Sequence, residues 1–359
     1  IISYATGIAL FAYNLYFMGI IFAVGKIELS RSYPVLYKSS IVRKNLLLRV
    51  YPILLLLFVT FALNGGLGEI RDVYGGDEFG GTSFVSKVLT SLIQFISLVL
   101  LLYSFKLYRQ HRTLCMYVIC SIFCISLIYL VCGNRGLPLS ILLLGLVGVN
   151  DNIRKFSVVE ILSLIVAGVF LLALIGYYRY YEETALDNML EQKQSVFDFA
   201  MDLIICNRNL YSLISYADTN GCLFFLTKIH VLSFIPFAQS TICSLFDIDP
   251  LYTTSAAFNS YLTFGDIKGN LGLGTNIVSD IYVSFGVIGV AICFFGLGYI
   301  MQIAQCRSKM NLQYYLVYYL LVSDVVFMCR GSMFEIIKLI VWIMLFDYLR
   351  SKIKELAKK

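Results

Sequence analysis

The stretch CGNRGLPLS, residues 132–140, separates two apolar runs and determines how the chain turns between them. About twenty nearly uncharged residues precede it, which is the length of a membrane-spanning helix, so Arg135 is expected at a helix end. Gly133 and Gly136 let the backbone turn closely. Pro138 suits the first turn of a following helix, because its missing N–H costs nothing there. The stretch predicts a helix hairpin with Arg135 at its mouth.

The composition indicates an all-α polytopic integral membrane protein. Of the 359 residues, 59% are hydrophobic and only 14% are charged, whereas a soluble domain is about a quarter charged. In lipid the backbone must satisfy its own hydrogen bonds, which favours helices. Apolar runs of spanning character predict about nine helices, near residues 3–25, 46–64, 86–105, 114–132, 137–149, 156–178, 281–304, 313–329 and 333–348.

Charged residues in the connections predict the orientation. The connections 26–49, 106–112, 150–155 and 305–312 and the tail 349–359 hold most of the 28 lysines and arginines. Short basic connections stay in the cytoplasm, so the C-terminus is expected inside and the start of the first apolar run outside. The apolar run is already under way at Ile1, and together with the outside start this predicts an earlier helix.

Two segments are expected on the outer side. Residues 65–85 are rich in glycine and acidic residues and are expected to form a flexible loop or lid. Residues 179–280 form a loop of a length that is usually functional, with helical periodicity in 186–218 and an apolar stretch at 224–238 that suits a re-entrant or interfacial segment. The chain therefore divides into N-terminal helices (1–178), a large outer loop (179–280), and C-terminal helices with a basic tail (281–359).

Several function classes lack their signatures. The ten cysteines form no CxxC pair, and no histidine is spaced to complete a zinc site. No dinucleotide or phosphate-loop motif occurs, so nucleotide hydrolysis is not expected. The DID sequence at 247–249 precedes Pro250 and is typical of a turn. The net charge of +6 follows from topology and does not indicate a nucleic-acid partner. No cofactor or metal is predicted.

Four arginines lie at boundaries on the outer side: Arg135, Arg179, Arg208 and Arg330. The planar guanidinium donates two hydrogen bonds and stays charged, which makes arginine the natural ligand of a phosphate group. Several of them near the outer interface would suit a lipid-linked pyrophosphate. The alternative is that they pair with acidic neighbours: Glu182, Glu183, Asp324 or Glu335.

The candidates for a general base are few. His230 is the histidine expected outside, and it could take a proton from a sugar hydroxyl. A single histidine in an apolar stretch is also often structural. Asp218, Asp266 and Asp280 are rival bases.

Two motifs and the loop arrangement resemble the O-antigen polymerase family, the Wzy-type oligosaccharide repeat-unit polymerases. The motifs are the GNRG turn at 133–136 and the stretch GLGTNIVSDIYVSFGVIGVAICFFGLGY at 272–299, where Asp280 leads into a glycine-bearing helix. The third feature is the large outer loop before the last third of the chain. The resemblance extends over nearly the whole sequence.

The resemblance implies an inner-membrane glycosyltransferase of GT-C-like architecture that needs no cofactor. Its substrates would be undecaprenyl-pyrophosphate-linked oligosaccharides, joined at the periplasmic face, and a chain-length regulator would be a further partner besides membrane lipid. By this resemblance, Arg135, Arg179, Arg330 and Asp280 are expected to bind substrate, Arg208 to stabilise the leaving group, and His230 to act as the base.

Two other readings stay open. An O-antigen ligase would differ only in its acceptor. A flippase or transporter for lipid-linked oligosaccharide would be expected to carry repeats with broken helices and charges at the membrane midplane. The outer position of the arginines favours the enzyme.

Overall fold

The computed structural model shows a helical protein. It describes residues 2–30, 44–75, 83–134, 136–164, 166–168, 206–222, 232, 234–235, 238–247, 254–265, 274–309, 311–325, 331–332, 337–338, 340–342, 344–345 and 348–349. The regular elements in this part of the chain are helices, without a strand. They belong to two compact units: residues 1–40, 206–267 and 272–359 form unit 1, and residues 41–205 and 268–271 form unit 2.

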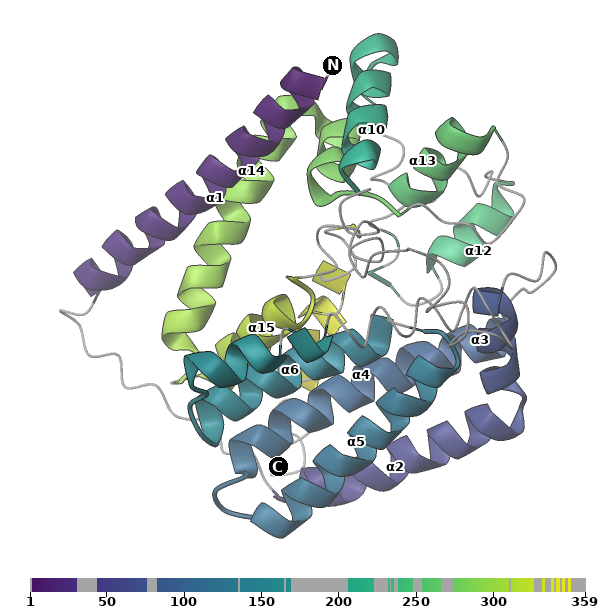
Figure 1. Ribbon diagram of the computed structural model, residues 1–359, viewed down its shortest axis with the longest axis vertical. Coiled ribbons are helices and arrows are strands. Elements are labelled where there is room, and N and C mark those ends of the chain that lie inside the picture. Colours follow the sequence, from purple (N-terminus) through teal and green to yellow (C-terminus); the bar gives the residue numbers. More distant parts are fainter. Residues whose placement is uncertain are drawn as a thin grey trace, which may run out of the picture. The chain divides into compact units, whose positions relative to one another are not determined.

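Unit 2 is a bundle of consecutive helices. Its described elements include α2 (Lys44–Leu63), α3 (Gly66–Gly75), α4 (Phe84–Leu107), α5 (Arg112–Val131) and α6 (Gly136–Asn152) (Figure 1). α4 packs against α2, α5 and α6 and holds the core of the bundle. On α2 the buried residues Leu47, Leu54 and Phe61 recur every seven positions, which places them on one helix face. The predicted hairpin is present, because α5 ends at Val131 and α6 begins at Gly136.

Five described helices are long and apolar enough to cross a membrane: Ile2–Lys26, Lys44–Leu63, Val85–Leu107, Arg112–Val131 and Ile277–Arg307. They coincide with five of the nine predicted spans, and the chain is a multi-pass membrane protein. The predicted span 137–149 corresponds to α6, which has 17 residues and is shorter than these five helices. The predicted spans 156–178, 313–329 and 333–348 lie partly outside the described residues.

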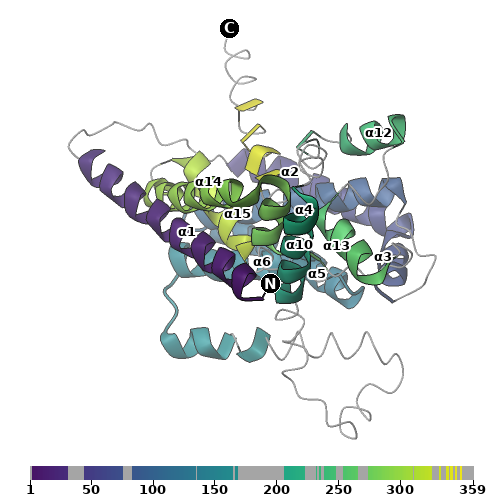
Figure 2. The same cartoon turned by 90° about the horizontal axis from the view of Figure 1, so that it is seen from above.

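Unit 1 is built on α1 (Ile2–Ser30) and α14 (Ile277–Arg307), which lie side by side in both views (Figures 1 and 2). The two helices run parallel. The Tyr4 and Tyr282 hydroxyls lie 2.9 Å apart near the two helix starts, and the Lys26 ammonium lies 5.7 Å from the centroid of the Tyr299 ring toward the two ends. The other helices of unit 1 among the described residues are α10 (Cys206–Asn220), α12 (Ala238–Leu245), α13 (Ser255–Phe264) and α15 (Leu312–Ser323).

Glycines bring the backbones of α1 and α14 into direct contact. A Cβ atom on Gly19 would overlap the carbonyl oxygen of Phe295, and one on Gly298 would overlap that of Tyr16. Small residues that let two helices approach closely are characteristic of packing in membranes, where lipid is as apolar as the side chains. The contact therefore depends on glycine on both helices.

α14 contains a break that the sequence pattern did not predict. Gly286 has φ 64° and ψ −160°, a conformation outside the helical region that glycine adopts readily. The break separates residues 277–285, of which nearly all are buried, from the longer half that follows. We call residues 277–285 the half-helix. The predicted span 281–304 crosses this break.

The prediction of a flexible loop over residues 65–85 is wrong for its first half. Residues 66–75 form α3, which begins after Gly65 in a left-handed conformation. Glu69 stands in the first turn of α3, where a negative charge complements the helix dipole. Its side chain also accepts a hydrogen bond of 2.8 Å from the Ser83 N–H, just before α4. Turn-forming glycines at both ends hid this short helix from the sequence pattern.

We expect this contact between α3 and α4 to depend on pH. The Ser83 backbone N–H and then the Ser86 side chain hold the pKa of Glu69 below its ordinary value of 4.5. A carboxyl with a lowered pKa in the folded state stabilises that state above its unfolded pKa and loses the effect as the pH falls through the folded value. The protection factor of the Ser83 amide against hydrogen exchange, which is the intrinsic rate divided by the observed rate, should therefore fall below pH 4.5. Glu69→Gln should abolish this pH dependence at the Ser83 amide. If the variant kept the pH profile of the wild type, Glu69 would not be its cause.

Candidate functional site

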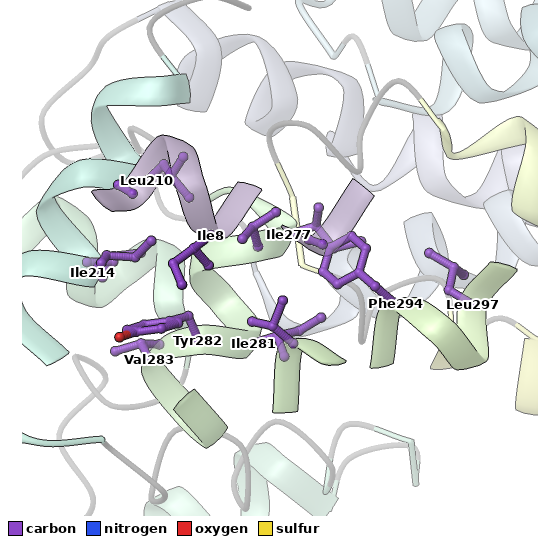
Figure 3. Close-up of a cluster of buried hydrophobic side chains, with 14 of the residues drawn as sticks. Ile8, Leu210, Ile214, Ile277, Ile281, Tyr282, Val283, Phe294 and Leu297 are labelled. Atoms are coloured by element: carbon purple, nitrogen blue, oxygen red, sulfur yellow. The ribbon is translucent and has the colours of Figure 1, made fainter. Parts of the chain in front are cut away.

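The half-helix carries Asp280 and Tyr282, whose side chains make the hydrogen bonds described below. Its start is capped by Asn276, whose side chain accepts a hydrogen bond from the Val278 N–H. Apolar residues anchor it: Figure 3 shows Ile8 of α1, Leu210 and Ile214 of α10, and Ile277 and Ile281 of the half-helix in one buried cluster. This apolar packing holds the half-helix in place and so fixes the position of its polar side chains.

Asp280 lies on the half-helix, is only 2% exposed, and joins three distant segments of the chain. Its Oδ1 accepts a hydrogen bond of 2.6 Å from the Ser255 hydroxyl at the start of α13. Its Oδ2 accepts one of 2.6 Å from the Ser332 hydroxyl. Thr275 Oγ1 lies 3.1 Å from Ser255 Oγ. A buried carboxylate is costly without such donors, so this arrangement is a closed polar cluster in which both oxygens are engaged.

A second set of hydrogen bonds fixes α13 against α10 and the approach to α14. The Asn259 side chain is fully buried. Its Oδ1 accepts a 2.6 Å hydrogen bond from the Ser212 hydroxyl of α10, and its Nδ2 donates to the Gly274 carbonyl at 3.3 Å. Asn259 thereby ties α10, α13 and the segment before the half-helix into one body.

Tyr282 connects the half-helix to α10 and α1. Its hydroxyl donates a 2.6 Å hydrogen bond to Oδ1 of Asp218, near the end of α10. Because that hydroxyl has a single proton, the 2.9 Å contact with Tyr4 requires the Tyr4 hydroxyl to donate to the Tyr282 oxygen. Tyr282 is 5% exposed, whereas Asp218 and Tyr4 are exposed. Tyr4 thus donates to Tyr282, and Tyr282 donates to the exposed carboxylate of Asp218.

Arg208 is the one predicted arginine of the site that the described residues include. It lies in the first turn of α10 and is exposed. Among the described residues, no hydrogen bond or ion pair engages it. Asp218 lies on the same helix as Arg208, near its end.

The other predicted site residues lie outside the described residues. These are Arg135, Arg179, Arg330 and His230, together with the rival base Asp266. The structure places Asp280 and Asp218 in two separate sets of hydrogen bonds, both of which involve the half-helix: Asp280 lies on it, and Asp218 accepts from its Tyr282. In the described part of the chain no three His, Cys, Asp or Glu side chains are grouped as a metal site, and Cys222 and Cys243 are free thiols.

Sequence reasoning missed Ser255, Ser332, Tyr282 and Tyr4 as members of the site. Thr254, the N-cap of α13, accepts a hydrogen bond from the Ala257 N–H, and a Thr-Ser pair before an apolar segment is a helix-start signal that could have placed Ser255. No local signal could have paired Tyr4 with Tyr282 or Ser332 with Asp280, because these contacts join residues far apart in the chain. The turn predicted at 247–249 is present at its first residue, Asp247, which has a φ of 48°.

Comparison with known proteins identifies the family. No curated protein matches the chain, and no solved structure matches it. The family O-antigen polysaccharide polymerase Wzy matches residues 2–352, nearly the whole chain and every helix described above. The match agrees with the resemblance seen in the GNRG turn and in the stretch at 272–299. The chain therefore belongs to the O-antigen polysaccharide polymerase Wzy family.

Proposed function

We propose that the chain joins undecaprenyl-pyrophosphate-linked oligosaccharide repeat units into O-antigen or a related surface polysaccharide, at the periplasmic face of the bacterial inner membrane. The growing polysaccharide on its lipid pyrophosphate is the donor, and a new lipid-linked repeat unit is the acceptor. The observation that carries this proposal is the family match over residues 2–352, since that family polymerises O-antigen polysaccharide. The activated donor makes a nucleotide or redox cofactor unnecessary.

The parallel arrangement of α1 and α14 supports the outer position of the site. Parallel helices cross the membrane in the same direction. The chain must therefore cross the membrane an even number of times between the start of α1 and the start of α14. A full crossing by the apolar stretch 224–238 would reverse the direction expected for α14, and the stretch is therefore proposed to be re-entrant or interfacial. Lys26 and Arg307 stand near the ends of α1 and α14, whereas Asp218 and Asp280 lie near the helix starts. The basic ends suit the cytoplasmic side.

The proposed architecture has about nine spans in a GT-C-like arrangement, with the C-terminus in the cytoplasm. Residues 179–280 form the periplasmic loop region between the N-terminal and C-terminal helices. A chain-length regulator is a proposed partner of this outer face. The described helices α10, α12 and α13 supply part of that region.

In the proposed mechanism the arginines act on the pyrophosphate. Arg135, Arg179 and Arg330 bind it, and Arg208 stabilises the negative charge that develops on it as the glycosyl bond breaks. Donors aimed at developing charge are among the largest contributions to catalysis. Arg208 is suited to this role because it is exposed and engaged by no described neighbour. The buried Asp280 cluster supports the framework of the site from inside.

The double variant Arg135→Ala, Arg208→Ala tests this role. Loss of one such donor typically lowers the rate about 100-fold or more, so a strain that carries the double variant should lose long polymer from its polysaccharide ladder. The protein level in the membrane is measured in parallel. Arg109→Ala, Arg112→Ala is the matched control, because both arginines are exposed and lie on the predicted cytoplasmic side. Full-length polymer from the Arg135, Arg208 variant would refute the arginine mechanism.

A further inference from the structure

Glycosyl transfer to a sugar hydroxyl requires a group that accepts the hydroxyl proton. Among the described residues, two rival bases lie in unit 1 around the half-helix: Asp280 and Asp218. Asp280 is 2% exposed, and serine hydroxyls donate to both of its oxygens at 2.6 Å. A substrate hydroxyl could reach it only by displacing these donors from a packed interior. Asp280 is therefore poorly placed to take a proton.

The environment of Asp218 differs from that of the buried Asp280. Asp218 is exposed, and its Oδ1 accepts a 2.6 Å hydrogen bond from the Tyr282 hydroxyl. Within the described residues no donor engages Oδ2. Tyr282 is itself held, because it is 5% exposed and accepts from Tyr4 at 2.9 Å. One carboxylate oxygen is thus anchored to the protein core, while the other is presented to the outside.

We propose that Asp218, in place of the His230 expected from the sequence, is the general base of the glycosyl transfer and that Tyr282, supported by Tyr4, positions it; this inference rests on the proposed function. Asp218 Oδ2 takes the proton of the acceptor hydroxyl as the hydroxyl oxygen forms a bond to the anomeric carbon of the donor. The bond from that carbon to the pyrophosphate oxygen breaks, and its electron pair leaves with the pyrophosphate. The protonated Asp218 then returns its proton to water.

The placement of Asp218 on α10 fits this role. Arg208, proposed to stabilise the leaving group, lies ten residues earlier on the same helix. Ten residues of α-helix span about 15 Å, a distance that the long arginine side chain and the sugar and pyrophosphate of the donor can bridge. The attacking and leaving oxygens lie on opposite sides of the anomeric carbon in a direct displacement. One rigid helix can therefore supply the base and the leaving-group cation.

Asp218→Asn is the decisive variant. The asparagine Oδ1 still accepts from Tyr282, so the fold is expected to persist, but the amide cannot take a proton. A general base contributes about 100-fold or more to the rate. The full-length variant in lipid nanodiscs, given undecaprenyl-pyrophosphate-linked repeat units, should lose at least that factor in kcat. Its affinity for undecaprenyl pyrophosphate and its unfolding temperature should stay at the wild-type values.

Three further variants separate the base from a structural role. Asp247→Asn is the matched control: Asp247 is also exposed, and asparagine tolerates its φ of 48°, so polymerisation should be unchanged. Tyr282→Phe removes the donor that positions Asp218, and kcat should fall on the order of tenfold. In Asp218→Ala, added formate should restore part of the activity by acting as an external base.

The outcomes distinguish this inference from the proposed function. Wild-type kcat in Asp218→Asn, or an Asp218→Ala variant that formate does not rescue, would overturn the base role. Polymerisation by the wild-type chain in the same assay would leave the proposed function standing in that case. No polymerisation by the wild-type chain from lipid-linked repeat units would overturn the proposed function and the base role with it.

Discussion

Replacing Gly298 by alanine should largely remove the folded protein from the membrane. The added Cβ would overlap the carbonyl oxygen of Tyr16, which belongs to the backbone of α1 and cannot rotate away. Overpacking costs about 1–3 kcal/mol where side chains can adjust, so a clash with backbone should lower the free energy of unfolding by about 3 kcal/mol or more. Fluorescence-detected gel filtration and thermal unfolding in detergent measure the loss.

The matched control lies two positions away on the same helix. A Cβ on Gly296 would meet no atom of a described residue within 4 Å, and alanine has a higher helix propensity than glycine by about 1 kcal/mol. Gly296→Ala should therefore fold as well as the wild type or slightly better. If Gly298→Ala accumulated and melted like Gly296→Ala, the close contact between α1 and α14 would be wrong. Gly19→Ala should resemble Gly298→Ala, because its Cβ would overlap the Phe295 carbonyl oxygen.

Asp280→Ala should have the second large effect, on both folding and polymer. The substitution removes two hydrogen bonds to a charged acceptor and leaves the buried hydroxyls of Ser255 and Ser332 without it. Hydrogen bonds to charged groups contribute about 1.5–3 kcal/mol each, so the free energy of unfolding should fall by about 3 kcal/mol or more. Long polymer should disappear in proportion to the lost protein.

Serine variants show whether the effect arises from these hydrogen bonds. Ser332→Ala removes one donor to Asp280 and should lose roughly half of the stability lost in Asp280→Ala. Ser308→Ala is the control, since Ser308 and Ser332 are each 8% exposed, but the Ser308 hydroxyl donates to Gln305 of its own helix at 2.7 Å. Equal unfolding temperatures for the two serine variants would contradict a special contribution of the Asp280 cluster.

The helices that the sequence predicts well are those whose pattern is long and uniform. The apolar runs near 46–64, 86–105 and 114–132 coincide with α2, α4 and α5, because a run of about twenty apolar residues has few alternatives to a membrane helix. The GNRG turn is equally readable, since Gly133 has a φ of 90°, a conformation that favours glycine. Local composition determines both features.

Features that depend on distant partners could not be predicted. Only the fold shows that hydroxyls 25 residues before Asp280 and 52 residues after it close around its carboxylate. The same limit applies to Tyr282, whose partner Tyr4 is 278 residues away. The break at Gly286 was hidden as well, because a glycine within an apolar run is compatible with a continuous helix. Tertiary contacts determine that Asp280 is buried and Asp218 is exposed to solvent.

The most direct test of the account is the polysaccharide ladder of a strain that lacks this gene, compared with the same strain after the gene is restored. If the chain is a polymerase, deletion should leave a single repeat unit on the core, and restoration should return the ladder. Polymer stranded on the carrier lipid, with no unit on the core, would indicate a ligase. Repeat units trapped on the cytoplasmic face would indicate a flippase, and an unchanged ladder would contradict the polymerase function outright.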